Sequence, residues 1–171
     1  VSLMENGERD FYFNRGADGQ LNKEDIEAID LDEFSIVHFG SATAFLPGPL
    51  QEAYTSLLKK ALAKNLFVSF DPNYRQLLFQ HQKESFTSQS WHFLHHCNFF
   101  KVSDEEAMML TGTSTYTDAA KVFLQKTNAV FAITIGKEGT LLGLNNETHT
   151  VPSIDITPVD TTGAGDAFTG A

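Results

Sequence analysis

The stretch "NFFKVSDEEAMMLTG", Asn98 to Gly112, joins a short apolar segment to the start of a helix. The segment "NFFKVS" is brief, rich in aromatic residues and bounded by polar ones, which is typical of a buried strand. Ser103 followed three residues later by Glu106 forms a capping box, and this pair predicts a helix over residues 104–110. A strand that leads directly into a helix is the unit from which α/β folds are built.

The same unit recurs on both sides of this stretch. Apolar runs and amphipathic patterns predict strands at 35–42, 66–73 and 129–136, and helices at about 50–62, 85–97 and 118–125. The segments "GTLLGLN" and "THTVPSI" predict a hairpin across Asn145 and Asn146, and "RDFYF" (9–13) predicts a half-exposed strand. Alternating strands and helices imply right-handed crossovers and a mainly parallel sheet that helices cover on both faces.

The composition describes a soluble globular domain of acidic character. The chain has 171 residues, with 42% hydrophobic and 20% charged residues, enough for one domain with a core. Its 12 Lys and Arg against 22 Asp and Glu give a net charge of -10, which argues against nucleic-acid or anionic-membrane partners. A single cysteine, Cys97, allows no internal disulfide, and no signal peptide or spanning segment is recognised, so we expect a cytoplasmic protein.

Polar and small residues follow the predicted parallel strands, in "FGSA", "DPNYR", "KVSDEE" and "TIGKEG". Ligands of parallel α/β sheets bind beyond the carboxyl ends of the strands, so the sequence predicts a site where these segments converge. The segment "DPNYR" brings Asn73 and Arg75 to this end of the sheet. The planar guanidinium of Arg75 suits phosphate oxygens, and a surface ion pair is the alternative interpretation.

The last stretch, "VDTTGAGDAFTGA" (159–171), places two glycines in front of a predicted helix. Free N–H groups at a helix start, together with the helix dipole, form a site for an anion such as phosphate. Asp166 beside them could accept a proton from an alcohol. The alternative is that the glycines only shape a turn and that Asp166 only favours the helix start. The spacing matches neither a Rossmann glycine motif nor a Walker A loop.

Together these segments resemble the ribokinase-like (PfkB) carbohydrate kinases. "DTTGAGDAFTGA" is similar to the C-terminal signature of that family, and "VHFGSATAFLPGP", "SFDPNYR", "FFKVSDEEAMMLTG" and "AITIGKEGTLL" resemble its fructokinase branch. The resemblance implies a three-layer α/β/α ribokinase-like fold. It identifies residues 1–20, with "GERDFYFNRGADGQL", as a lid strand and return segment, and residues 21–171 as an incomplete nucleotide- and phosphate-binding core. Relatives carry further strands before it and an adenine-covering segment after it, so we expect an inactive fragment of a longer kinase.

The resemblance also implies roles for individual residues. Asp166 is the expected general base and contacts the sugar, while the amides of Gly163, Ala164 and Gly165 hold the developing charge. The expected residues of the ATP site are Asn73, Arg75, Lys101, Glu106, Thr134 and Gly136, with Glu106 near Mg²⁺ through water. The capping box by itself explains Ser103 and Glu106 equally well.

Three further residues have weaker assignments. Asp160 and Thr162 match the place where relatives bind a monovalent cation such as K⁺. Arg15 resembles a lid residue that reaches the sugar, and an exposed edge charge is the alternative. The cluster of His92, His95, His96 and Cys97 is interpreted as a solvated helix face rather than a metal site, because no second group completes four ligands.

The function that the resemblance implies is ATP- and Mg²⁺-dependent phosphorylation of a sugar hydroxyl, with fructose as the expected acceptor. Two alternatives stay open. The first is the same reaction on 2-keto-3-deoxygluconate, ribose or another polyol, and the second is a non-catalytic binding module. A homodimer formed through the lid is the expected assembly.

Overall fold

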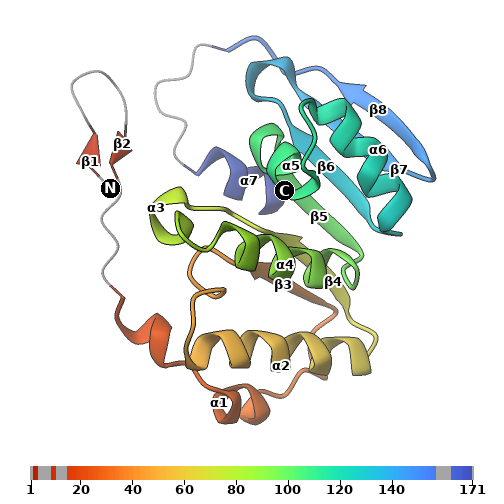
Figure 1. Cartoon of the computed structure of the whole chain (residues 1–171). Coiled ribbons are helices and arrows are strands. Elements are labelled where there is room, and N and C mark those ends of the chain that lie inside the picture. Colours follow the sequence, from red (N-terminus) through yellow and green to blue (C-terminus); the bar gives the residue numbers. More distant parts are fainter. Residues whose placement is uncertain (1, 4–8, 11–14, 157–162, 171) are drawn as a thin grey trace.

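The computed structural model describes residues 2–3, 9–10, 15–156 and 163–170, which contain a six-stranded sheet and a separate two-stranded ribbon (Figure 1). The large sheet is ordered β3-β4-β5-β6-β7-β8. Its strands are β3 (Ile36–Gly40), β4 (Phe67–Asp71), β5 (Phe99–Ser103), β6 (Val130–Thr134), β7 (Thr140–Leu144) and β8 (Glu147–Val151). The pairings from β3 to β6 are parallel and those of β7 and β8 are antiparallel, which confirms the mainly parallel sheet.

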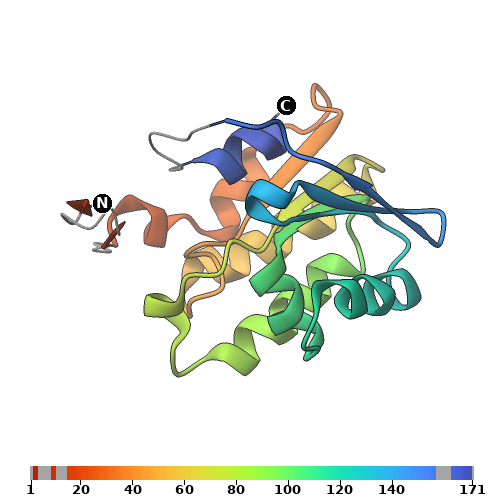
Figure 2. The ribbon, with the colours of Figure 1, turned by 90° about the horizontal axis from the view of Figure 1, so that it is seen from above.

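The helices that connect the parallel strands lie on one face of this sheet. They are α2 (Pro49–Ala63), α3 (Gln76–Phe79), α4 (Lys83–Leu94), α5 (Asp104–Thr111) and α6 (Tyr116–Lys126). Each crossover advances by one strand with the same hand, so its helix falls on the same side. Figure 2 shows α7 (Ala164–Gly170) on the opposite side of the sheet. The expected cover of both faces is therefore unequal, because within the described residues α7 is the only helix on the second face.

A row of phenylalanines forms the centre of the core. Phe39, Phe70, Phe100 and Phe131 are neighbours in register across β3, β4, β5 and β6, and each is fully buried under the helices. The rings of Phe100 and Phe131 stack with centroids 5.3 Å apart. Aromatic rings bury large areas and interlock at such distances, so this row fixes the register of the parallel strands.

The local signals of the sequence mark several element ends correctly. Ser103 Oγ accepts the N–H of Glu106, and the Glu106 carboxylate accepts the N–H of Ser103, which confirms the capping box of α5. Asn145 and Asn146 both adopt left-handed φ values, 53° and 63°, and form the predicted turn between β7 and β8. The hairpin ends earlier than predicted, because β8 stops at Val151, immediately before Pro152.

Two short helices were not predicted. The helices α1 (Lys23–Ala28) and α3 span six and four residues, too few for an apolar period to show. Tertiary contact supports α1, because Lys60 Nζ of α2 donates to the carbonyl oxygens of Ile26 and Glu27, both at 3.1 Å. These bonds satisfy carbonyl groups that a helix end leaves without partners.

The N-terminal segment forms a ribbon of its own. Strand β1 (Ser2–Leu3) pairs antiparallel with β2 (Arg9–Asp10), while residues 11–13 of the predicted strand lie outside the described residues. The assignment of residues 1–20 to a lid stays a prediction. Among the helices that the structure describes, none has the length and apolar character needed to cross a membrane.

Candidate active site

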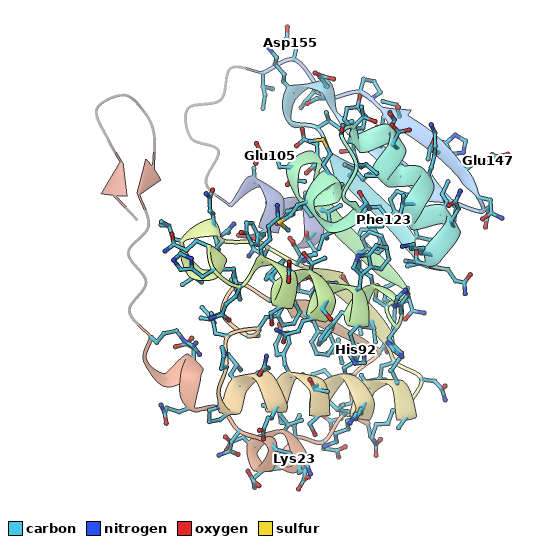
Figure 3. The ribbon with its side chains drawn as sticks, viewed as in Figure 1. Lys23, His92, Glu105, Phe123, Glu147 and Asp155 are labelled. Carbon is cyan, nitrogen blue, oxygen red and sulfur yellow. The ribbon has the colours of Figure 1, made fainter. Side chains whose placement is uncertain are left out.

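A cleft of about 850 Å³ opens at the carboxyl ends of β4 and β5, where α7 begins. Its lining comes from three stretches of the chain and includes Asn73, Arg75, Lys101, Ser103, Glu105, Glu106, Gly163, Gly165 and Asp166. Glu105, labelled in Figure 3, marks the start of α5 at this cleft. The structure thus brings together most of the site residues that the sequence pointed to.

The first turn of α7 presents backbone N–H groups next to a carboxylate. Gly163 has a left-handed φ of 73°, and its carbonyl accepts the N–H of Ala167 at 2.8 Å. The helical hydrogen bonds begin there, so the amides of residues 164–166 have no acceptor within the helix. Asp166 is exposed, and it lines both the main cleft and a second hollow of about 580 Å³. Its carboxylate is therefore accessible to a ligand.

A third hollow, of about 410 Å³, adjoins the same turn. Thr134 and Gly136 line it together with Ala164 and Gly165. The turn from β6 to β7 requires glycine at residue 139, because φ there is 114° and an added β-carbon would lie 2.1 Å from the carbonyl oxygen of Val151. Thr134 and Gly136 therefore lie beside the first turn of α7, in a hollow separate from the cleft that Glu106 lines.

Glu106 connects two loops at the strand ends. Its Oε2 accepts the N–H of Ser103 at 2.8 Å, and its Oε1 accepts the N–H of Tyr74 at 2.7 Å. Burial, and after it the nearby Asp71 carboxylate, raises the pKa of Glu106 above the usual range of a carboxyl group. The side chain thus holds the "DPNYR" segment against the start of α5, in addition to its capping role.

Asp71 is a site residue that the sequence reasoning missed. It ends β4, it is buried, and its Oδ2 lies 3.2 Å from Lys101 Nζ, with side-chain exposures of 5% and 10% for the pair. Its Oδ1 accepts the N–H of Asn73 at 3.0 Å, in a turn where Asn73 has a φ of 50°. The available signal was an acidic residue at the end of an otherwise apolar strand.

The two arginines of the predicted site have different positions. Arg75 lines the main cleft, where its Nη1 donates to the carbonyl oxygen of Tyr74 at 3.4 Å. Arg15 lines none of the three hollows, and its Nε donates to Asp18 Oδ2 at 2.9 Å. The N–H of Gly16 and, more weakly, Thr43 and Arg15 lower the pKa of Asp18. Asp160 and Thr162 lie outside the described residues.

The histidine cluster lies at the far end of α4 from this cleft. The rings of His92 and His96 are 4.9 Å apart, whereas the His95 ring packs against Trp91, so the three histidines do not share one face. Burial of His92, and after it the neighbouring His96, lowers the pKa of His92. Within residues 15–156 and 163–170 there is no group of three or more His, Cys, Asp or Glu side chains that could hold a metal ion.

Comparison with known proteins identifies the family. The sequence profile of the "pfkB family carbohydrate kinase" matches residues 1–171. The chain belongs to the pfkB family. Fructokinase-1 of Zea mays is 31% identical over 174 residues, covering 100% of this chain and 53% of the relative, so the chain spans about half the length of the curated relatives it matches.

Solved structures of pfkB kinases share the fold. An E. coli protein provisionally named Ribokinase II superposes with a TM-score of 0.84 at 26% identity, over 98% of this chain and 53% of that one, and it has also been solved with ATP and Mg²⁺. A second solved structure is fructokinase of Vibrio cholerae in a form with fructose, ADP and calcium ion bound. It superposes with a TM-score of 0.69 at 27% identity, over 79% of this chain and 43% of that one. The three-layer ribokinase-like fold class is confirmed.

Proposed function

We propose that the full-length protein transfers the γ-phosphoryl group of ATP to a hydroxyl group of fructose. The observation that carries this proposal is the convergence of Asp166, the open amides of α7, Lys101 and Glu106 on one cleft at the strand ends. Membership of the pfkB family and 31% identity to a fructokinase over the whole chain support the choice of reaction and acceptor.

In the proposed reaction, Asp166 accepts the proton of the sugar hydroxyl as that oxygen attacks the γ-phosphorus. The exposed position of its carboxylate is compatible with this role. The amides of Gly163, Ala164 and Gly165 stabilise negative charge on the transferred group, which matters because phosphoryl transfer depends mainly on positioning and electrostatics. Thr134, Gly136, Asn73 and Arg75 bind the nucleotide phosphates.

A magnesium ion fits the acidic side of the cleft. Both Glu106 oxygens already accept backbone N–H groups, and Asp71 is paired with Lys101, so these carboxylates suit contact with the ion through its waters. The ion would neutralise charge on the nucleotide phosphates. A monovalent cation near Asp160 and Thr162, a cytoplasmic location and a dimer formed through the lid stay predictions.

Ribose or a riboside is the second candidate acceptor. The solved structures that match this chain include aminoimidazole riboside kinase of Salmonella enterica, with a TM-score of 0.71 and 27% identity. The two candidates share the phosphoryl-transfer machinery of residues 163–166 and differ only in the acceptor, so one assay separates them.

The test measures ADP formation by the full-length protein with a panel of sugars, and repeats it with Asp166→Asn. We expect turnover with fructose, and a loss of kcat of roughly 100- to 10,000-fold in the variant, because asparagine cannot accept the proton. Turnover confined to ribose or a riboside would establish the second candidate. An Asp166→Asn variant with undiminished turnover would remove the general-base role.

A further inference from the structure

Lys101 lies where the phosphate-binding turn meets the sheet. Its Nζ is 3.2 Å from Asp71 Oδ2, and a β-carbon added to Gly165 would lie 2.8 Å from the same Nζ. Lys101 and Gly165 line the main cleft together with Asp166. The ammonium therefore lies between a strand-end carboxylate and the backbone of the first turn of α7.

The backbone of Gly165 gives no reason for glycine. Gly163, Gly136 and Gly139 have φ values in the left-handed region, whereas Gly165 does not and lies within α7. Alanine is the better helix former at such a position. Outside the chain neighbours and the backbone of α7, Lys101 is the only described residue that a β-carbon at residue 165 would meet within 4 Å. The absence of a β-carbon therefore serves to admit the ammonium.

Asp71 holds the ammonium from the other side. A buried charge is costly unless it is paired, and Lys101 is only 8% exposed. The Asp71 carboxylate supplies the partner, and it is itself oriented by the N–H of Asn73 at 3.0 Å. These contacts hold the ammonium in one position, whereas the flexible side chain of a surface lysine moves among many.

We propose that Asp71 and Gly165 position the Lys101 ammonium beside the phosphate-binding turn, where it neutralises charge on the transferred phosphoryl group. This inference rests on the proposed phosphotransfer. In that step the bond from the γ-phosphorus to the ADP oxygen breaks and the bond to the sugar oxygen forms, while the hydroxyl proton passes to Asp166. Lys101 exchanges neither a bond nor a proton, and it acts by its charge.

A double-mutant cycle between Gly165→Ala and Lys101→Gln tests the contact in the full-length protein. Glutamine is one bond shorter than lysine, so it leaves room at residue 165 and still offers an N–H to Asp71. Gly165→Ala alone should lower kcat by about 100-fold, because the methyl group displaces the ammonium. In the Lys101→Gln background, Gly165→Ala should lower kcat by less than about threefold, as expected when the two residues are coupled neighbours.

Two further variants complete the set. Asp71→Asn should lower kcat by roughly tenfold, because the ammonium keeps its charge and loses its fixed position. Lys121→Gln is the matched control, since Lys121 forms an exposed ion pair with Asp118 at 2.8 Å, and it should leave kcat unchanged. Lys101→Met, equally short and uncharged, replaces Lys101→Gln if that variant does not fold.

Binding of ADP with aluminium fluoride separates positioning from general damage, because this complex mimics the phosphoryl group in transfer. Gly165→Ala and Asp71→Asn should weaken its binding by about the factor lost in kcat, and should weaken binding of ADP alone by less than about threefold. Equal weakening of both ligands would overturn the inference, because it would show a structural role alone.

Thermal unfolding tests the steric contact without any need for activity. Gly165→Ala should lower the melting temperature by roughly 2–4 °C in the wild-type background. In the Lys101→Gln background the same substitution should leave the melting temperature unchanged or raise it, because alanine is the better helix former. Equal shifts in both backgrounds overturn the inference. A wild-type protein that forms no ADP with any sugar overturns the proposed function instead, and the unfolding cycle still decides whether Lys101 and Gly165 are coupled.

Discussion

Cys97 is a buried thiol three residues after the end of α4, and its environment makes the stability of the folded protein fall at alkaline pH. Burial raises the pKa of Cys97 to about 12, so the folded state keeps a proton that the unfolded state releases above pH 9. The stabilisation is complete below about pH 9 and is lost as the pH rises toward 12.

Cys97→Ala removes this dependence. Between pH 8 and pH 10 we expect the wild type to lose roughly 1 kcal/mol more unfolding free energy than the variant. Urea unfolding of both proteins at the two pH values measures the difference. The comparison cancels the pH response of every other group. If both proteins lose the same unfolding free energy between pH 8 and pH 10, burial does not raise the pKa of Cys97.

Single residues of the site differ in how far their sequence context predicts them. Asp166, Gly163 and Glu106 stand in local motifs, a glycine turn before a helix and a capping box, so the sequence identifies them. Asp71 stands at the end of an apolar strand with no such motif. Its importance comes from Lys101, 30 residues away, and that pairing depends on the adjacency of β4 and β5.

Among the elements, β7 depends on close contact with the ring of Phe131. Gly143 is the register partner of Phe131, and a β-carbon on Gly143 would lie 2.1 Å from Cζ of that ring. Gly143→Ala should therefore lower the unfolding free energy by about 1–3 kcal/mol, through displacement of the ring from the core. Urea unfolding measures the loss.

Gly40→Ala is the matched strand control, because its nearest contact would be His38 Nε2 at 3.9 Å. We expect its unfolding free energy to stay within about 0.5 kcal/mol of the wild type. If Gly143→Ala lowers the unfolding free energy as little as Gly40→Ala does, the ring of Phe131 does not lie in close contact with Gly143.

The long elements were predictable and the short ones were not. The helix α2 carries an apolar stripe over its 15 residues, and each strand from β3 to β6 is an apolar run closed by polar residues. The helices α1 and α3 have too few residues for a stripe. They form because tertiary partners complete their hydrogen bonds, as Lys60 does for α1.

On the scale of the whole molecule, one sheet face is only partly covered. Ile36, Phe67 and Val130 belong to the face that carries α7, and they are 60%, 45% and 36% exposed. An apolar surface of this kind binds hydrophobic dyes and promotes association. We therefore expect the 171-residue chain, taken alone, to bind such a dye and to associate as its concentration rises.

Phe67→Lys should reduce both effects, with dye fluorescence falling by roughly half. Leu77→Lys is the control, because Leu77 is 56% exposed but lies on α3, away from this face. Fluorescence titration and light scattering during size-exclusion chromatography measure the two effects. If the chain stays monomeric and the dye shows no increase in fluorescence, this face does not behave as accessible apolar surface.

The sequence by itself determined the order of the six strands of the large sheet and of the longer helices, the capping box of α5, the hairpin turn at Asn145 and Asn146 and the glycine turn before Asp166. These features arise from hydrogen bonds and periodicities within a few residues, so a local pattern carries them. Only the tertiary structure decided that Lys101 meets Asp71 and Gly165, that Glu106 holds Tyr74, and that Arg15 bonds to Asp18 away from the cleft. It also decided which face of the sheet the helices cover. Those contacts depend on which strands become neighbours and on the hand of each crossover, and these are properties of the packed chain rather than of any one segment.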